Sequence, residues 1–328
     1  MDTFAPAEVV RKLTSRLKMR HLQLLLRIQQ HGSLTRVAEE MATSQPAVTN
    51  ALAEVEGMFG AALFDRSARG MAPTPLGKVA LGRARSIIND LEHLVRDMET
   101  VATGNAAHLH IGVIPFISGQ MLSTAIQHTL PQGGGRLTLT IHEGTSDQLM
   151  QQLRDHTLDI AIGRPSAKVN IDQLEFETLY DQQPRLVAGR RLAAQLGRRR
   201  LNWRQLAGLD WIMGAPGTPI REQVSDIFLK AGVAPPAPII ESYATKLMGE
   251  LIVSNDNALA IVPADIADEL VRIAGVAIVP YSFDWTLPPI ALFTRREGPQ
   301  PDAIRLFAEA LRAACKQAPY TKEREARY

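Results

Sequence analysis

The stretch over residues 32–60 reads GSLTRVAEEMATSQPAVTNALAEVEGMFG and holds two short helical patterns that meet at Thr43 and Ser44. Ser33 and Ser44 each stand directly before one pattern, where a hydroxyl can accept a backbone N–H as an N-cap. Pro46 falls in the first turn of the second pattern, where no backbone donor is missed. Both patterns carry apolar residues at helical spacing, and the stretch therefore predicts a helix-turn-helix. The side chains expected to be buried are Leu34, Val37, Ala38, Met41, Val48, Leu52, Val55 and Phe59.

The leading end of the second helix carries uncharged polar side chains. Gln45, Thr49 and Asn50 face outward if the apolar side is buried. An amide can pair with adenine through two hydrogen bonds, and a hydroxyl can contact any base, so this end suits a duplex groove. An ordinary pair of surface helices would show the same periodicity, and the periodicity alone does not separate the two readings.

The charge distribution favours a nucleic-acid partner for the N-terminal part. Formal net charge is only +2, but residues 11–88 hold twelve cations and five anions. That segment is therefore at +7 and the rest of the chain at −5. A basic segment of this kind attracts phosphate groups.

Cysteine usage and hydropathy exclude two classes of protein. Cys315 is the only cysteine, so no intramolecular disulfide can form. It falls in a helical apolar pattern, which predicts a packed small side chain and not a reactive thiol. No stretch approaches the roughly 20 apolar residues of a membrane span, and no secretion signal is recognisable. We expect a cytoplasmic protein that does not contact membranes.

Short elements flank the helix pair. Helical patterns at 7–17 and 18–31 precede it, and the second should brace it. After Gly60, a tight turn at 67–71 is typical of a wing. Arg66 and Arg69 flank this turn. Either they contact phosphate groups or the minor groove of DNA, or they are simply solvated, and the sequence leaves both alternatives open.

A long helix follows, with Thr74 as its cap and Pro75 at its first position. Apolar residues repeat along it in a heptad-like seam between polar ones. A narrow apolar stripe on a protruding helix must be buried, and a second copy of the chain is the expected partner, with packing on its own body as the alternative. Gly104 and Asn105 end the helix. The seam residues expected to pair are Ile87, Ile88, Leu91, Leu94, Val95 and Met98.

From residue 108 the pattern changes to alternating strands and helices. Strands are expected at 109–113, 137–141, 158–162, 211–213, 239–240, 259–262, 276–279 and 290–294. Helices are expected at 117–130, 147–155, 220–231, 245–253, 264–273 and 303–315. Such succession predicts parallel sheets covered on both faces. We expect two α/β lobes, with the chain crossing near 180–185 and returning near Phe283.

With these residues in view, the chain resembles the LysR-type transcriptional regulators. The motifs that carry the resemblance are GSLTRVAEEMATSQPAVT, LFDRSARGMAPTPLG, the long helix and the two lobes, which are similar to periplasmic binding proteins. The resemblance implies a winged helix-turn-helix that binds double-stranded promoter DNA, dimers paired through the linker helix and assembling into tetramers, and a small effector between the lobes. It also allows contact with RNA polymerase, and it implies no enzyme activity and no cofactor.

The resemblance sets the expected boundaries. They are a DNA-binding domain at 1–73, a linker helix at 74–104, an effector-binding domain at 105–316 and a flexible tail at 317–328. Lobe I would take 105–182 and 283–316, and lobe II 183–282. The residues expected to contact DNA are Ser33, Thr35, Arg36, Ser44, Gln45, Pro46, Thr49, Asn50, Arg66 and Arg69.

Two segments bear on the branch and on departures from the family pattern. SNDNALAIVP and APGTPIR are similar to regulators of sugar and aromatic-acid catabolism, so the effector expected is an organic acid or sugar derivative. Asn50, Ala53 and Glu54 stand where many relatives carry cations, which reduces the phosphate contacts of that helix. Residues 254–257 replace a glycine-rich turn, and asparagine tolerates the same left-handed conformations.

An anionic effector would be held by backbone N–H groups at helix starts, by hydroxyls and by one or two cations. Candidates therefore lie where strands end and helices begin, although helix capping alone would explain each hydroxyl. In lobe I they are Pro115, Phe116, Ser118, Thr145, Ser146 and Arg164. In lobe II they are Gly217, Thr218, Arg221, Tyr243 and Thr245.

Other chemistry has little support in the sequence. His108 and His110 share one face of a strand, with His142 expected nearby, but no cysteine or carboxylate cluster completes a ligand set, so no metal is expected. Residues 198–200 are three arginines in a loop of the distal lobe, where solvation or a subunit contact is favoured over DNA. No phosphate-binding glycine loop or nucleophile elbow is present. The rival hypothesis is a binding protein or enzyme whose N-terminal unit only mediates association.

Overall fold

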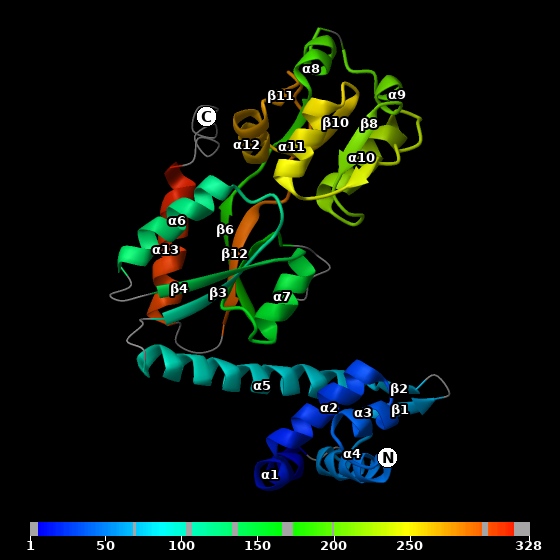
Figure 1. Cartoon of the computed structure of the whole chain (residues 1–328), viewed down its shortest axis with the longest axis vertical. Coiled ribbons are helices and arrows are strands. Elements are labelled where there is room, and N and C mark those ends of the chain that lie inside the picture. Colours follow the sequence, from blue (N-terminus) through cyan, green and yellow to red (C-terminus); the bar gives the residue numbers. More distant parts are fainter. Residues whose placement is uncertain are drawn as a thin grey trace. The chain divides into compact units, whose positions relative to one another are not determined.

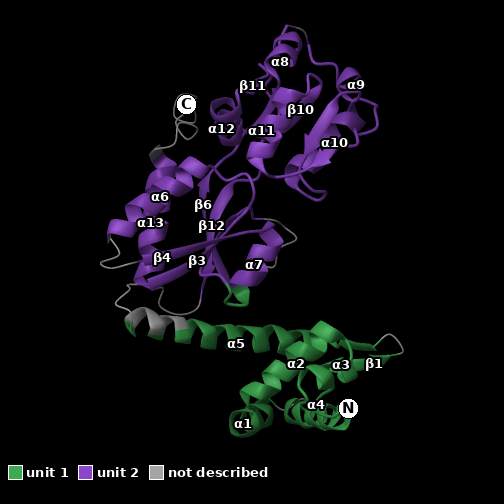
Figure 2. Ribbon diagram, viewed as in Figure 1, with its two compact units in different colours: residues 1–103, 154–157 green, residues 104–153, 158–328 purple. Residues whose placement is uncertain are grey.

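The computed structural model describes residues 6–67, 70–102, 107–132, 137–165, 173–198, 200–296 and 301–317. The chain forms two compact units, shown in green and purple in Figure 2. Unit 1 holds residues 1–103 with the short segment Arg154–Thr157, and unit 2 holds residues 104–153 and 158–328. Each unit is described by itself below.

Unit 1 begins with the helices that the sequence predicts. They are α1 (Pro6–Arg16), α2 (Met19–His31), α3 (Leu34–Glu40) and α4 (Gln45–Phe59). Leu25, Ile28, Val37 and Val55 are fully buried between them, which confirms the predicted apolar faces. Met41, expected to be buried, is only half-buried. A second expectation shifts by a residue: α4 buries Met58, and Phe59 is half-buried against the core of the unit. Both positions lie one turn beyond Val55, so periodicity alone could not choose between them.

The wing is a two-stranded antiparallel hairpin of β1 (Phe64–Ser67) and β2 (Gly70–Pro73). Glu56 of α4 anchors it, because its Oε1 accepts the backbone N–H groups of Leu63 at 2.8 Å and Phe64 at 3.2 Å. Gly70 has φ +111, and a Cβ there would lie 2.4 Å from the carbonyl oxygen of Gly32. Only glycine allows β2 to pass so close to the end of α2.

The helix α5 (Pro75–Ala102) follows the wing. Its start is capped as predicted: the Gly77 N–H donates to Thr74 Oγ1 at 2.9 Å, and the Thr74 hydroxyl donates to the Ala62 carbonyl. A Cβ on Gly77 would lie 1.9 Å from the Leu63 carbonyl oxygen, so the helix start packs directly on the wing's backbone. Cap and glycine together set where α5 leaves the winged unit.

Lobe I of unit 2 is a five-stranded sheet in the order β4-β3-β5-β12-β6. The strands are β3 (Ala107–Val113), β4 (Leu137–Glu143), β5 (Ile160–Gly163), β6 (Leu174–Tyr180) and β12 (Ile290–Arg295), and the helices are α6 (Gly119–Gln132), α7 (Ser146–Arg154) and α13 (Asp302–Gln317). Figure 1 shows α6 and α13 packed together on one side of the sheet and α7 on the other. Phe293 and Phe307 are fully buried in its core.

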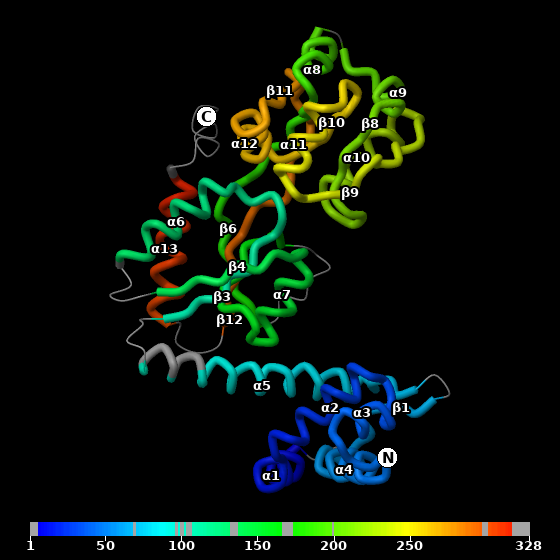
Figure 3. The backbone as a smooth tube through the Cα atoms, viewed as in Figure 1, coloured from blue at the N-terminus to red at the C-terminus, as the bar shows by residue number. Residues whose placement is uncertain are grey.

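Lobe II is a second five-stranded sheet in the order β11-β7-β10-β8-β9. Its strands are β7 (Pro184–Ala188), β8 (Asp210–Met213), β9 (Ile240–Glu241), β10 (Ala258–Pro263) and β11 (Ala277–Ile278), and its helices are α8 (Arg190–Leu196), α9 (Trp203–Leu206), α10 (Pro219–Lys230), α11 (Thr245–Ser254) and α12 (Ala264–Ala274). The chain crosses from lobe I after β6 and returns before β12, as the tube in Figure 3 shows. The two-lobed α/β architecture is thus confirmed.

The expectation of purely parallel sheets was wrong. β3 runs parallel to β4 and β5, but β12 is antiparallel to both its neighbours, β5 and β6. In lobe II, β10 is parallel to β8 and antiparallel to β7. The strands β6 and β7, which lead across to lobe II, were also not predicted, and neither were α8 and α9. Within the described residues, no helix has the length and apolar character needed to cross a membrane.

Candidate nucleic-acid interface and interlobe site

The leading end of α4 presents the predicted polar side chains. Gln45 and Asn50 are exposed, and Thr49 is half-buried. The Gln45 side-chain amide donates to Thr49 Oγ1 at 3.0 Å, and the Thr49 hydroxyl donates to the Gln45 carbonyl oxygen at 3.0 Å. These two bonds hold the amide of Gln45 along the helix surface, so its orientation is set before any partner arrives.

The serines before the two helices act as caps. Ser33 Oγ accepts the N–H of Arg36 at 3.5 Å, and Ser44 Oγ accepts the N–H of Ala47 at 3.4 Å. The capping role predicted for both is therefore confirmed. Of the other residues expected to contact DNA, Thr35, Arg36 and Pro46 are exposed on the same helices.

The wing brings one predicted cation to the surface. Arg66 is exposed on β1, opposite Met71 of β2. The Met71 N–H donates to the Gly32 carbonyl at 2.8 Å, which ties the wing to the start of the helix-turn-helix. Arg69 lies outside the described residues.

Helix α5 has a stripe of exposed apolar side chains, which we call the α5 stripe: Ile87, Leu91, Leu94, Val95 and Met98. Leu94 is 53% exposed, Val95 63% and Met98 63%, which is unusual for such side chains on a stable helix. Ile88, the sixth residue predicted for pairing, is half-buried. The stripe is an apolar surface that the described residues of the chain leave uncovered.

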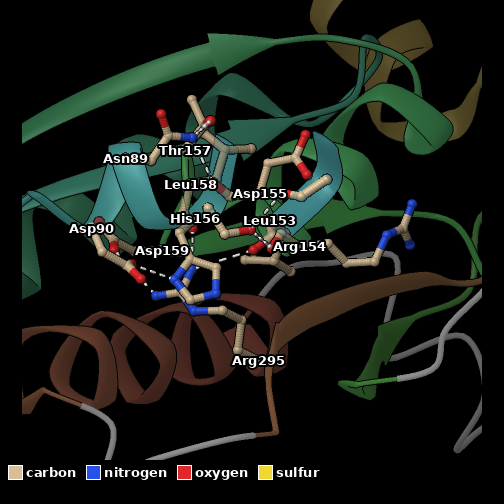
Figure 4. A network of polar contacts seen from close by, with 12 residues as sticks. Asn89, Asp90, Leu153, Arg154, Asp155, His156, Thr157, Leu158, Asp159 and Arg295 are labelled. Carbon is tan, nitrogen blue, oxygen red and sulfur yellow. Dashed lines mark hydrogen bonds and ion pairs between the residues drawn. The ribbon is translucent and has the colours of Figure 1, made fainter. Parts of the chain in front are cut away.

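Another side of α5 makes polar contacts with the segment Arg154–Thr157, which belongs to the same unit (Figure 4). Asn89 Nδ2 donates to Thr157 Oγ1 at 2.8 Å, and Arg85 pairs with the buried carboxylate of Asp155 at 3.3 Å. Asp90 contacts His156 Nδ1 at 2.5 Å. These partners occupy the polar positions of α5 and leave the α5 stripe open.

In lobe I the predicted effector residues gather at one edge of the sheet. Pro115, Phe116 and Ser118 follow β3, Thr145 and Ser146 follow β4, and Arg164 follows β5, and these three strands run parallel. Two of the hydroxyls cap helices: Ser118 Oγ accepts the Met121 N–H at 3.3 Å, and Thr145 Oγ1 accepts the Gln148 N–H at 3.4 Å. Ser146 Oγ instead accepts the Arg164 N–H at 3.1 Å and joins two of the strand ends.

Phe116 and Tyr243 meet between the lobes. Phe116 has φ +66, a left-handed conformation that is rare outside glycine, and its side chain packs on the core of lobe II. Its ring lies edge-on to that of Tyr243, with the centroids 5.5 Å apart. The Tyr243 hydroxyl accepts the Ala215 N–H at 2.9 Å, which places it over the loop after β8. Backbone strain at such a position is typical of binding sites.

Arg164 is the centre of a buried polar network. Its guanidinium donates to the Pro288 carbonyl and to Gln182 Oε1. Gln182 Nε2 in turn donates to both carboxylate oxygens of Asp265, at 2.9 and 2.7 Å, and the Tyr180 hydroxyl donates to the same carboxylate at 3.2 Å. Asp265 belongs to lobe II, so this network links the two lobes.

Burial shifts the titration of both charged members of this network. The pKa of Arg164 falls to about 10, because burial disfavours the cation, although Tyr180 and Asp265 oppose the shift. Burial likewise raises the pKa of Asp265, against the hydrogen bonds from Gln182 and Tyr180 that favour its charged form. Arg164 is 8% exposed, so it is a buried bridging cation and not the open carboxylate anchor that its position suggested.

The remaining lobe II candidates lie on the loops after β8 and β9. Gly217 is exposed with φ +79, and the Thr218 hydroxyl donates to the Ala215 carbonyl at 3.0 Å. Arg221 pairs with Glu241 at 3.4 Å. Thr245 is the first residue of α11. Tyr243, through its bond to Ala215, also joins these two loops.

Sequence reasoning missed Gln182, Tyr180 and Asp265. Asp265 follows the carboxyl end of β10, the kind of position used to choose the other candidates, so the same rule applied to β10 would have found it. Gln182 and Tyr180 had no such signal, because β6 was not predicted and a glutamine in a crossover looks like any exposed polar residue.

The described residues include no group of three or more His, Cys, Asp or Glu side chains that could hold a metal ion. The rings of His108 and His110 stack with their centroids 4.6 Å apart, and His110 Nδ1 lies 3.1 Å from His142 Nε2, so the three histidines are adjacent as expected. Cys315 is buried, as predicted, and burial raises the pKa of its thiol to about 12. Such a thiol is not ionised near neutral pH.

Two family models match the chain. The model described as the LysR substrate binding domain matches residues 102–316, and the bacterial regulatory helix-turn-helix protein model of the lysR family matches residues 19–78. Together they cover α2–α4, the wing and both lobes.

Named relatives span nearly the whole chain. The HTH-type transcriptional regulator GbpR of Azospirillum brasilense is 28% identical over 311 residues, which cover 92% of this chain and 88% of that protein. PcaQ of Agrobacterium fabrum (strain C58), named an HTH-type transcriptional regulator, is also 28% identical over 311 residues, covering 91% of this chain and 95% of that protein.

Solved structures share the fold. The crystal structure of CbnR, a LysR family transcriptional regulator, has a TM-score of 0.60 at 20% identity. The match covers 92% of this chain and 100% of the CbnR chain. A structure of full-length CbnR complexed with its target DNA gives the same TM-score of 0.60 at 21% identity, over 91% of this chain and 100% of that one. LysG from Corynebacterium glutamicum with bound effector Arg has a TM-score of 0.58 at 17% identity, over 92% of this chain and 99% of that one.

Proposed function

Because the chain belongs to the LysR family of transcriptional regulators, we propose that α4 reads its operator through Gln45 and Asn50. The protein is a ligand-responsive, DNA-binding transcriptional regulator with an N-terminal helix-turn-helix and a two-lobed effector-binding domain. The exposed amides at the leading end of α4 carry the proposal, because Gln45 is already oriented along the helix by Thr49. Arg36 and Arg66 would contact the phosphate backbone.

Fluorescence anisotropy with a labelled duplex from the region upstream of the protein's own gene tests this proposal. Gln45→Ala and Asn50→Ala should each weaken binding about tenfold or more, since a two-bond amide contact to a base contributes about 1–3 kcal/mol. Gln30→Ala is the matched control, because it removes an exposed amide from α2. The proposal fails if all three variants bind as the wild type does, or if the control loses as much as the other two.

We extend the proposal to assembly through the α5 stripe, with the linker boundaries at 74–104 expected from the sequence. Two copies of α5 packed through Leu91, Leu94 and Met98 would bury side chains that the single chain leaves exposed. Paired subunits would place two copies of α4 on related half-sites of one operator, and two such dimers would form the tetramer. The promoter is in the cytoplasm, where the regulator would also meet RNA polymerase.

The effector is proposed to bind between the lobes, against Phe116, Ser146 and Tyr243. The strained backbone of Phe116 and its edge contact with Tyr243 support this placement, because they join loops of both lobes. The structure of LysG, which is similar in fold, has the effector Arg bound. For this chain we propose an organic acid or sugar derivative, held by hydroxyls and backbone N–H groups, with no cofactor and no reaction.

A thermal-shift screen of sugars, sugar acids and aromatic acids on the full chain tests the effector class. A compound that raises the melting temperature in proportion to the logarithm of its concentration binds the native state. Ser146→Ala should reduce that shift, whereas Ser123→Ala, an exposed hydroxyl on α6, should leave it unchanged. A shift that both variants retain in full would place the compound elsewhere.

A further inference from the structure

Lobe II has a hollow that lies away from the residues that join the two lobes. A cavity of about 550 Å³ lies at the end of α8, before α9 and after β11. Figure 1 shows these three elements at the end of lobe II that is remote from lobe I. Apolar walls come from Leu196, Leu201 and Pro280, and polar groups come from Arg198, Arg200 and Tyr281.

The floor of this hollow is built into the core of the lobe. Leu196, Leu201 and Tyr281 all pack on the buried cluster of lobe II. The Tyr281 ring lies edge-on to Trp203 and Phe283, with centroid distances of 6.0 and 4.9 Å. These contacts hold the ring and the two leucines in place without any ligand, so the hollow is preformed.

One wall is formed by a close approach of two segments. A Cβ on Gly197 would lie 2.7 Å from Pro280 Cγ, so the end of α8 and the segment after β11 touch at this point. Any other residue at 197 would push these segments apart. Gly197 and Pro280 both line the hollow, so this contact forms part of its wall.

The charge around the hollow is strongly positive. Residues 182–209 contain seven arginines and no aspartate or glutamate. Arg190 donates to the Gly275 carbonyl at 3.2 Å, and Arg191 lies 3.7 Å from Asp256. Arg198 and Arg200 are exposed and have no hydrogen bond or ion pair with any residue that the structure describes. Two like charges at the mouth of one cavity favour an anion between them.

We propose that this cavity binds a small organic oxyanion, a molecule with a carboxylate or phosphate group and an apolar body. The oxyanion would lie between the guanidinium groups of Arg198 and Arg200, and the Tyr281 hydroxyl would donate a third hydrogen bond. The apolar body would cover Leu196, Leu201 and Pro280. Duplex DNA would use the charges but not the apolar floor, which is why the geometry favours a small molecule. The site is separate from the interlobe effector site and does not depend on it.

Tryptophan fluorescence of the full chain tests the proposal. The three tryptophans, Trp203, Trp211 and Trp285, all pack in or against the core of lobe II, and Trp203 contacts the Tyr281 ring. The probes are phenyl phosphate, benzoate and inorganic phosphate, each titrated alone. Phenyl phosphate and benzoate should give saturable quenching, and the tighter of the two identifies the oxyanion. Inorganic phosphate should bind at least threefold more weakly than phenyl phosphate, because it cannot cover the floor.

Matched variants locate the signal. R198A/R200A should lower the affinity for the tighter-binding probe tenfold or more, and Y281F should lower it about threefold. R190A/R204A removes two charges from exposed arginines of the same lobe that do not line the cavity, and should change the affinity less than twofold. Ser123→Ala, at an exposed hydroxyl of α6 outside both sites, should have no effect.

Several results would overturn the proposal. They are the absence of saturable binding by either organic probe, equal losses in R198A/R200A and R190A/R204A, or loss of the signal in Ser123→Ala. A fourth is an R198A/R200A variant that binds the probes normally but binds promoter DNA more weakly, which would make this surface a DNA contact. Circular dichroism checks that each variant is folded, and Y281F tests the site with both arginines in place.

Discussion

At the scale of single residues, Gln182 connects the two lobes. It lies in the crossover after β6, where one side-chain amide serves partners on both sides. Its oxygen accepts from Arg164 of lobe I, and its NH₂ group donates to Asp265 of lobe II. All three side chains are buried, so water cannot replace a lost bond without opening the structure.

We predict that Gln182→Ala destabilises the effector-binding domain. The change would remove one buried partner from each charged group: the guanidinium of Arg164 would keep only the Pro288 carbonyl, and the carboxylate of Asp265 would lose both bonds from the Gln182 amide and keep the Tyr180 hydroxyl. Hydrogen bonds to charged groups contribute about 1.5–3 kcal/mol each, so the free energy of unfolding should fall by about 2–3 kcal/mol. Urea unfolding followed by tryptophan fluorescence measures this free energy, since the three tryptophans of the chain all pack in or against the core of lobe II.

Gln183→Ala is the matched control. Gln183 is the next residue of the same crossover, and it bonds the Ala264 N–H through its backbone carbonyl, which alanine keeps. Its substitution should change the free energy of unfolding by less than about 0.5 kcal/mol. Equal effects of the two substitutions would show that the network does not stabilise the domain.

Asp265 should make the domain's stability depend on pH. Burial raises the pKa of Asp265 in the folded state above its unfolded value of about 3.9. The folded state therefore holds this proton more tightly, and the stabilisation is full below the unfolded pKa and is lost as the pH rises through the folded pKa. Asp265→Asn cannot titrate, so the unfolding free energy of the wild type minus that of the variant should fall as the pH rises from about 4, and then level off.

The measurement is urea unfolding of wild type and variant at a series of pH values. Asp284→Asn, at an exposed carboxylate of lobe II, serves as the control and should give a difference that is flat in pH. A difference for Asp265→Asn that rises with pH would mean that the charged form is the favoured one in the fold.

At the scale of elements, two glycines in helices have opposite surroundings. Gly57 lies inside α4, and a Cβ there would meet nothing within 4 Å. Gly77 lies in the first turn of α5, where a Cβ would overlap the Leu63 carbonyl oxygen at 1.9 Å. The first glycine only weakens its helix, whereas the second permits the contact between helix and wing.

We predict opposite signs for the two alanine substitutions. Gly57→Ala should stabilise unit 1 by about 0.5–1 kcal/mol, because alanine loses less backbone entropy in a helix. Gly77→Ala should destabilise it by about 2 kcal/mol or more, because the start of α5 must move off the wing. Thermal unfolding followed by far-ultraviolet circular dichroism gives both values. The packing described for α5 is wrong if Gly77→Ala proves as harmless as Gly57→Ala.

At the scale of the whole molecule, the α5 stripe supports the proposal that the working form is more than one chain. Leu91 is 39% exposed and Leu94 53% exposed on a helix whose polar side already has partners in Arg154–Thr157. Pairing would cover the stripe and double the number of recognition helices on one DNA. Binding at two half-sites raises the overall affinity by about 10²–10⁴ through effective concentration.

We therefore predict that Leu91→Glu together with Leu94→Glu separates the chains and weakens operator binding about a hundredfold or more. Glu92→Ala, an exposed position between the two, is the control and should keep both assembly and affinity. Light scattering after size exclusion gives the mass, and anisotropy with a two-half-site duplex gives the affinity. Assembly through this helix is refuted if the double variant keeps the mass of the wild type.

Much of the N-terminal unit could be predicted from the residues alone. Ser33, Ser44 and Thr74 mark helix starts through contacts with residues three positions away, and such local contacts leave a direct trace in the order of residues. The polar face of Gln45 and Asn50 follows from the same helical period. The candidate effector loops could likewise be predicted, because they lie where a predicted strand ends and a predicted helix begins.

What the tertiary structure alone decided depends on residues far apart in the chain. The direction of β12 is set by its pairing with β5 and β6, more than a hundred positions earlier, and no local pattern encodes a strand's direction. Gln182 and Asp265 meet across 83 positions, and Arg164 and Pro288 across 124. Gln182 and Asp265 look like surface residues in the sequence, and they form one buried network with Arg164 and the Pro288 carbonyl only because the chain crosses to lobe II and returns.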